Sequence, residues 1–231
     1  MNIVITGASR GIGKAIAEKF ASQGHHLFLT SKKEDGLQNT VRALQASYPT
    51  ILIASKAFDL RHEAGDFGEW ILSKGIEVDV LINNAGSFSP GQVQDEPIGL
   101  LEEQLATNLF GAYHLTRKLL PSMIKRKAGH IFNICSIASL KAYPNGGAYG
   151  ISKYALYGFS QNLRMEMMPY HIKVTAVFPG AVLTESWGDY DNSAARIMEA
   201  SDIATMIYAA TQLTAAACVE DIIIRPLLGD L

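Results

Sequence analysis

Cysteine is scarce in this sequence, with Cys135 and Cys218 the only two among 231 residues. Two cysteines cannot form a disulfide framework or a four-ligand zinc site, so we expect no metal site and a reducing, cytoplasmic setting. A long hydrophobic run is also missing. The longest uncharged stretch, 203–219, is shorter than the ~20 residues of a membrane span and contains threonine and glutamine, so no membrane association is expected.

Neither sign of charge is in excess, because 20 basic residues stand against 22 acidic ones, for a formal net charge of −2. Without a positive field there is no general attraction for a phosphate backbone, which argues against a dedicated nucleic-acid binder. Hydrophobic residues make up 48% of the chain. That share excludes a disordered chain, because so much apolar surface can form a core.

Short apolar runs alternate with longer segments of helical periodicity along the whole chain. Continuously apolar runs are typical of strands buried on both faces of a parallel sheet. Right-handed crossovers then predict an α/β, doubly wound sheet of about seven parallel strands with helices on both faces, in one domain, 1–231. The expected strands are 3–5, 26–30, 51–58, 78–82, 130–134, 174–178 and 221–225, and the expected helices are 15–23, 37–47, 64–73, 98–127 (with a bend at Pro121), 149–168 and 202–213.

A glycine-rich turn, Thr6-Gly7-Ala8-Ser9-Arg10-Gly11-Ile12-Gly13, lies between the first expected strand and the first expected helix. Glycines at this place permit a tight turn and let a pyrophosphate approach the backbone N–H groups of a helix N-terminus. The spacing is Gly-x-x-x-Gly-x-Gly, which differs from the commoner dinucleotide fingerprint. Taken alone, the turn is also compatible with an ordinary connection between a strand and a helix.

Further motifs follow in order. They are Asn83-Asn84-Ala85-Gly86 after the fourth strand, Asn108 in the long helix, Ser136 after the fifth strand, Tyr149-x-x-x-Lys153 in the next helix, Pro179-Gly180 after the sixth strand, and Thr184. Together with the glycine turn, this series resembles the short-chain dehydrogenase/reductase family from residue 2 to the C-terminus. The resemblance implies a Rossmann-like NAD(P)-binding reductase domain with a short substrate lid at about 185–201. The cofactor-binding residues that it implies are Gly7, Ser9, Arg10, Gly11, Ile12, Gly13, Lys32, Asp59, Asn84, Ala85, Gly86, Tyr149, Lys153, Pro179, Gly180 and Thr184.

Tyr149 and Lys153 are the centre of the expected chemistry. Four residues apart on a helix, they project from one face about one turn apart. A phenol is a poor acid or base near neutrality, and a nearby ammonium group favours the phenolate and lowers its pKa. The resemblance implies that Tyr149 is the general acid, that Ser136 orients the substrate oxygen, and that Lys153 binds ribose hydroxyls. It also implies that Asn108 holds a water of a proton relay.

The end of the second strand bears on the choice of cofactor. An acidic residue there would bind a ribose 2′-OH and repel a 2′-phosphate, but Thr30 stands at this place. Arg10 and Lys32 supply two cations instead, which favours NADPH over NADH. The alternative is that Lys32 belongs to a solvated loop, and the neighbouring acids at 34 and 35 keep NADH open. Asp59 resembles the family residue that contacts the adenine ring.

Together with these patterns, the resemblance implies an NADPH-dependent reductase of small ketones or aldehydes, with a carbonyl or alcohol as substrate. One alternative is a 3-oxoacyl-[acyl-carrier-protein] reductase, for which the basic run 125–127 would dock an acidic carrier protein. A second alternative is a non-catalytic NADP-binding regulator. The resemblance also implies a homodimer or homotetramer formed through the helices 98–127 and 149–168.

Overall fold

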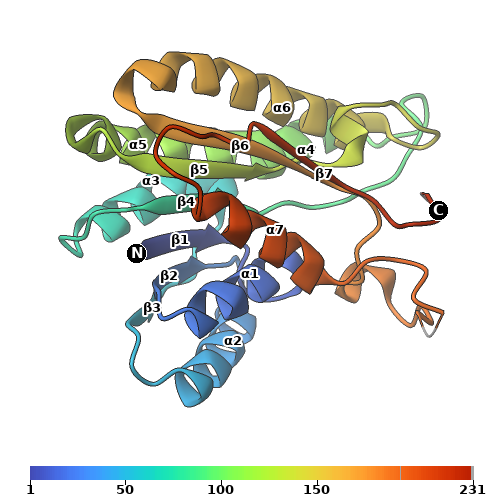
Figure 1. The fold of residues 1–231 in the computed structure, drawn as a ribbon. Helices are drawn as coiled ribbons and strands as arrows, with labels where there is room; N and C mark the ends of the chain where they lie inside the picture. Colours follow the sequence, from blue (N-terminus) through green and yellow to red (C-terminus); the bar gives the residue numbers. More distant parts are fainter. Residues whose placement is uncertain (193, 230–231) are drawn as a thin grey trace.

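The fold is a single parallel sheet with helices on both faces (Figure 1). The computed structural model describes residues 1–192 and 194–229. Seven strands lie in the order β3-β2-β1-β4-β5-β6-β7, and every pair of neighbours is parallel. This confirms the predicted α/β doubly wound sheet. The strands are β1 (Asn2–Thr6), β2 (His26–Thr30), β3 (Ile53–Ser55), β4 (Val80–Asn83), β5 (Gly129–Ile134), β6 (Ile172–Pro179) and β7 (Asp221–Ile224).

The helices cover the sheet from two sides. The main helices are α1 (Gly11–Ser22), α2 (Glu34–Ser47), α3 (Leu60–Leu72), α4 (Leu100–Leu105), α5 (Gly111–Arg126), α6 (Gly147–Met167) and α7 (Ala200–Thr211). Helices α1, α2 and α7 lie on one face, whereas α3, α5 and α6 lie on the other (Figure 1). Of the described residues, none belongs to a helix long and apolar enough to cross a bilayer.

Alternate residues of the inner strands fill two separate hydrophobic cores. In β1, for example, Ile3 and Ile5 pack with α1 and α7, while Val4 between them packs with α3 and α5. All three side chains are completely buried. Burial on both faces explains why these strands read as uninterrupted apolar runs rather than as an alternating pattern.

Three expected elements differ from the structure in informative ways. Strand β3 is three residues long rather than eight, because it is an edge strand that pairs only with β2 and is half-buried. The predicted long helix 98–127 is divided by a π-helical turn, η1 (Ala106–Phe110), between α4 and α5. Pro121 lies inside the continuous helix α5. Helix α1 begins at Gly11, inside the glycine turn, four residues earlier than predicted.

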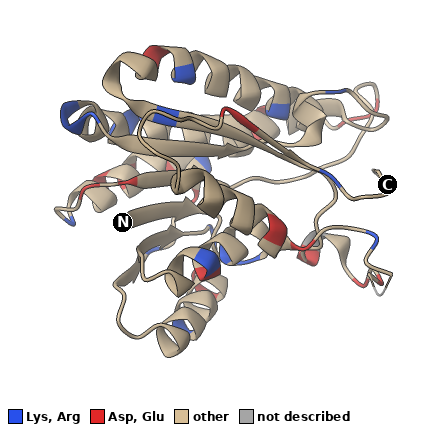
Figure 2. Ribbon diagram, in the orientation of Figure 1, with Lys and Arg blue, Asp and Glu red and all other residues tan. Residues whose placement is uncertain are grey.

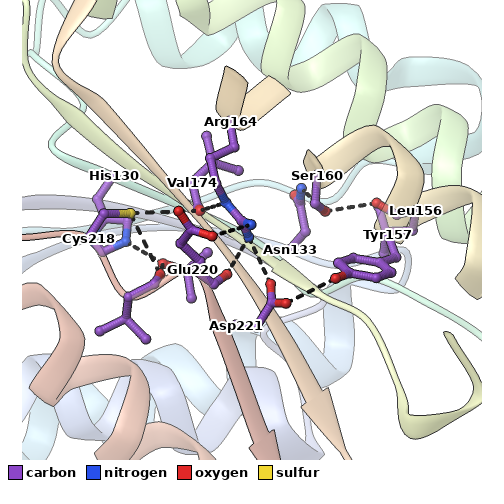
Figure 3. A network of polar contacts seen from close by, with 12 residues as sticks. His130, Asn133, Leu156, Tyr157, Ser160, Arg164, Val174, Cys218, Glu220 and Asp221 are labelled. Carbon is purple, nitrogen blue, oxygen red and sulfur yellow. Dashed lines mark hydrogen bonds and ion pairs between the residues drawn. The ribbon is translucent and has the colours of Figure 1, made fainter. Parts of the chain in front are cut away.

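Arg164 of α6 ties this helix to the edge strand β7 (Figure 3). Its side chain is nearly buried; its Nε donates to the carbonyl oxygen of Val174 at 2.9 Å, and its Nη2 lies 2.8 Å from Oδ1 of Asp221. The guanidinium also binds the carbonyl and the carboxylate of Glu220. Tyr157, two turns earlier on α6, donates to the other oxygen of Asp221 at 3.0 Å.

Replacing Arg164 by alanine should lower the free energy of unfolding by about 3 kcal/mol, because it leaves two carbonyl groups and a partly buried carboxylate without their arginine partner. Urea denaturation measures the loss. Arg42, an exposed arginine of α2, offers a matched control whose replacement should cost less than ~0.5 kcal/mol. Equal stability of the two variants would show that the network does not hold β7 in place.

Candidate active site

The candidate site lies where the strand order reverses, between β1 and β4. In open α/β sheets, ligands bind in the crevice at the carboxyl ends of the strands that flank such a reversal. The glycine turn follows β1, Asn84 and Ala85 follow β4, and Ser136 follows β5. The topology therefore gathers the predicted residues at one edge of the sheet.

The glycine turn is packed so closely that side chains at its glycines would collide with neighbouring groups. A Cβ at Gly13 would lie 2.3 Å from the carbonyl oxygen of Gly7 and 2.4 Å from Nδ2 of Asn84. Gly7 has a φ of +65°, and a Cβ there would lie 2.9 Å from the same Nδ2. Asn84 in turn donates to the carbonyl oxygens of Thr6 and Gly7. The turn therefore packs closely against the β4 loop. Because its glycines carry no side chains, a pyrophosphate can approach the backbone of the turn.

The N-terminus of α1 opens at this turn. Arg10 is the N-cap residue, and its side chain makes no capping hydrogen bond within the described chain. Gly11, with a φ of +52°, faces the methyl group of Thr184, which a Cβ would approach to 3.1 Å. Ile12 is half-buried against the core beneath α1. A helix N-terminus of this kind favours an anion.

Lys32 and Asp59 are brought together after β2 and β3. Nζ of Lys32 lies 3.3 Å from Oδ2 of Asp59, while the lysine side chain stays 59% exposed. Asp59 also accepts hydrogen bonds from the backbone and side chain of Arg61, and Arg61 is the main reason that its pKa lies far below the usual value. Asp59 therefore caps α3 and forms an ion pair with Lys32. Its contact with the adenine ring stays a prediction.

Tyr149 and Ser136 meet at the carboxyl end of β5. Burial raises the pKa of Tyr149 to about 12, although the Ser136 side chain favours the ionised phenol. This is opposite in direction to the lowering that the sequence predicts, because desolvation penalises the phenolate more than its neighbours stabilise it. The phenol is therefore protonated at neutral pH, which suits a proton donor.

Lys153 lies beside this pair and is buried. Its Nζ donates to the carbonyl oxygen of Ile134 at 2.8 Å and lies 5.9 Å from the centre of the Tyr149 ring. A Cβ at Gly86 would approach this Nζ to 3.5 Å, so the absence of a side chain at Gly86 leaves room next to the ammonium group. Burial lowers the pKa of Lys153 to about 8.

Asn108 lies in the π-helical turn η1, and its amide group is engaged with protein partners. Its Nδ2 lies 2.9 Å from Oγ of Ser152 and 3.1 Å from Oε1 of Gln104, and its Oδ1 accepts from the backbone of Ser87 at 2.8 Å. Ser152 also donates to the carbonyl oxygen of Tyr149. Asn108 therefore links the β4 loop to the helix that carries Tyr149, and its contact with a relay water stays a prediction.

Sequence reasoning missed Gln104 and Ser152 as members of this network. Gln104 is buried and also donates to the hydroxyl of Ser87 at 3.0 Å. A signal existed, because Gln104 precedes Asn108 by four residues and Ser152 follows Tyr149 by three. A polar residue at helical spacing from a candidate is a neighbour on the same face.

The predicted lid, 185–201, leaves the sheet after β6 and returns to α7. Its base is closed by hydrogen bonds from Leu183 to Met198 and from Met198 to Ala181. Helix α7 begins at Ala200, so the last two predicted lid residues belong to that helix, and residue 193 lies outside the described part.

Pro179 and Gly180 precede the lid and pair with β7. Ser9 binds Thr40 of α2 through its carbonyl oxygen.

Known proteins resemble this chain in sequence and in fold. A family model described as short chain dehydrogenase matches residues 1–194. The chain is 33% identical to the sepiapterin reductase of Chlorobaculum tepidum, covering 99% of this chain and 97% of that one. It is 38% identical to the dehydrogenase/reductase SDR family member 7B of Xenopus tropicalis over 79% of this chain and 61% of that protein. A metagenomic short-chain oxidoreductase, solved in complex with NADP, aligns with a TM-score of 0.85 at 31% identity over 98% of this chain and 96% of that one.

The fold, the glycine turn and these matches define an oxidoreductase of the NAD(P)-dependent kind, which interconverts carbonyl and alcohol groups. The chain belongs to the short-chain dehydrogenase/reductase family.

Proposed function

We propose that this protein, as a single reductase domain, uses NADPH to reduce the carbonyl group of a small ketone or aldehyde. The observation that carries the proposal is the position of the buried Lys153 Nζ, 5.9 Å from the centre of the Tyr149 ring, next to the carboxyl end of β5 that leads to Ser136. The sepiapterin reductase and the NADP complex among its relatives support the reductase direction and the cofactor.

Each side chain has a distinct task in this mechanism. NADPH, when bound, supplies the hydride. The glycine turn and the N-terminus of α1 hold the pyrophosphate, and Lys153 binds the ribose hydroxyls. The Ser136 hydroxyl donates to the substrate oxygen, and Tyr149 gives that oxygen its proton as negative charge develops there. The ammonium of Lys153 then stabilises the phenolate that remains.

A 3-oxoacyl-[acyl-carrier-protein] reductase would need a basic surface for its carrier. The basic run 125–127 lies at the end of α5, where Figure 2 shows a patch of blue. Arg126 is largely committed to the protein itself, because it binds Glu77, Asp79 and the carbonyl oxygen of Val78. The remaining two lysines offer a weak docking surface, so a small free carbonyl compound is the better substrate proposal.

Spectrophotometry of NADPH oxidation with a panel of carbonyl compounds tests these functions against one another. The panel contains small aliphatic ketones, aryl ketones, α-dicarbonyl compounds, a steroid ketone and a β-ketoacyl thioester. Turnover of compact free carbonyls supports the proposal. Turnover of the thioester alone would favour the fatty-acid reductase, and tight NADPH binding without any turnover would favour a non-catalytic regulator.

Trp187 of the lid offers a test of substrate size. Its ring lies 5.2 Å from that of Tyr190, and both side chains are half-buried, so they can present flat apolar walls. Replacement of Trp187 by alanine should raise KM for aryl ketones at least ~fivefold, as expected for the loss of about 1 kcal/mol of apolar contact, and raise it less for acetone-sized ketones. Equal changes in KM for both classes would contradict this role.

We also propose that α4, α5 and α6 form the interface of a homodimer or homotetramer. Large apolar side chains stand exposed on these helices and on the η1 turn between α4 and α5, among them Phe110 (44%), Tyr113 (37%) and Ile151 (46%). Phe110 and Tyr113 line an apolar hollow together with Leu109 and His114. Exposed apolar groups of this size on one face are typical of an interface.

Light scattering should therefore give at least twice the mass of the chain. A Phe110→Glu variant should shift the protein toward monomers, because a charge at an apolar interface leaves an ionised group without a partner. Lys127→Glu, at the exposed end of α5, serves as a charge-changing control. A dilute wild-type monomer with full activity would contradict the proposed assembly.

A further inference from the structure

The helix that carries Tyr149 and Lys153 has no cap of its own. Its N-cap residue is Gly146, which has no side chain to bind the free N–H groups of the first turn. A carboxylate from elsewhere in the chain fills this role. Oε1 of Glu96, in the loop between β4 and α4, accepts a hydrogen bond from the backbone N–H of Ala148 at 2.8 Å. Ala148 immediately precedes Tyr149.

The contact is built into both segments. Gly147 has a φ of +33°, and a Cβ there would lie 2.0 Å from Oε1 of Glu96 and 2.6 Å from the carbonyl oxygen of Gly91. Only glycine leaves room for the carboxylate at this position. A second hydrogen bond, from the backbone N–H of Gly91 to the carbonyl oxygen of Asn145 at 3.0 Å, joins the same two segments. Glu96 itself is half-buried.

The same loop also reaches the side chain of Tyr149. The Phe88 ring stands edge-on to the Tyr149 ring, with 4.8 Å between the centroids. The loop of residues 87–96 therefore contacts Tyr149 through its ring and, at Glu96, through the backbone just before it. A loop that is fixed to the first turn of α6 fixes the height and direction of the phenol relative to Ser136.

We propose that Glu96 is a positioning residue, which caps the catalytic helix from the β4 loop and holds Tyr149 in place for proton transfer. The inference rests on the proposed role of Tyr149 as the general acid. Glu96 does not touch the reacting atoms. Its carboxylate acts through the first turn of α6, where a charged acceptor is stabilised by the helix dipole.

Three variants test this role: Glu96→Ala removes the acceptor, Glu96→Gln keeps an oxygen acceptor of the same reach, and Glu102→Ala removes an exposed acid of the nearby α4. We expect Glu96→Ala to lower kcat at least ~fivefold, because a displaced general acid loses its alignment, while the Kd for NADPH changes less than ~twofold. Glu96→Gln should recover most of kcat, and Glu102→Ala should match the wild type.

Hydrogen exchange at the Ala148 amide, followed by NMR, provides a readout independent of turnover, and it should be faster in Glu96→Ala alone. If the wild type reduces no carbonyl, the proposed function fails, although the exchange still reports the cap. If the wild type is active and the Glu96→Ala variant, saturated with NADPH, keeps the wild-type kcat, the positioning role is overturned. Equal losses of kcat and NADPH binding would likewise overturn it, since they indicate general unfolding.

Discussion

Replacement of Tyr149 by phenylalanine should lower kcat at least ~100-fold, the usual scale of a lost general acid. The change removes one oxygen atom from a half-buried side chain, and the aromatic contact with Phe88 can persist. Because the glycine turn and Lys153 are untouched, the Kd for NADPH should change less than ~threefold. Steady-state kinetics with a compact ketone gives kcat, and the quenching of protein fluorescence by NADPH gives the Kd.

Tyr154→Phe is the matched control for this experiment. It makes the same chemical change on the same helix, at an exposed side chain, and it should leave kcat within ~twofold. A Tyr149→Phe enzyme that retains near-normal kcat would exclude this phenol as the acid. Loss of both turnover and NADPH binding would instead indicate damage to the cofactor site.

The unaltered protein should use NADPH with a kcat/KM at least ~tenfold above that for NADH, equal to ~1.4 kcal/mol. Arg10 lies at the N-terminus of α1 and Lys32 follows β2, so both can face a 2′-phosphate. Their contributions should differ. Lys32 already shares an ion pair with Asp59, whereas no ion pair of Arg10 is present in the described structure, so Arg10→Ala should reduce the preference more than Lys32→Ala.

Lys33→Ala is the control for charge alone, because it removes a neighbouring exposed cation. It should leave the ratio within ~twofold. The double variant Arg10→Ala/Lys32→Ala should bring the two cofactors close to equal use, mainly through a higher KM for NADPH. Equal use of NADPH and NADH by the wild type would contradict the assignment, and so would a double variant that keeps the full preference.

Much of the fold could be predicted because the amino-acid composition of each strand reflects how deeply it is buried. Strand β1 reads as an apolar run since its residues face two cores, and the same holds for β6. The residues at which helices begin were harder to predict. Helix α1 begins at Gly11, whose lack of a side chain serves the turn and gives no helical signal. Asn108 lies in a π-helical turn and bonds to the β4 loop, and no local sequence pattern reveals that contact.

The candidate site was predictable as a set of residues, but its electrostatics were not. Spacing places Tyr149 and Lys153 on one face, and the structure brings them together with Ser136. The direction of the Tyr149 pKa depends on how deeply the ring is buried, which the sequence does not state. The pairing of Lys32 with Asp59 joins residues 27 positions apart, after different strands, and therefore follows from the topology alone.

Transfer of deuterium from NADPH that carries deuterium at both C4 positions of the nicotinamide tests the central claim most directly. The labelled cofactor is incubated with the protein and a compact aryl ketone, and the product is examined by mass spectrometry and NMR. The account predicts an alcohol that carries one deuterium on the former carbonyl carbon, formed by the wild type and at least ~100-fold more slowly by Tyr149→Phe. A wild-type protein that binds NADPH but transfers no deuterium to any carbonyl compound of the panel would contradict it.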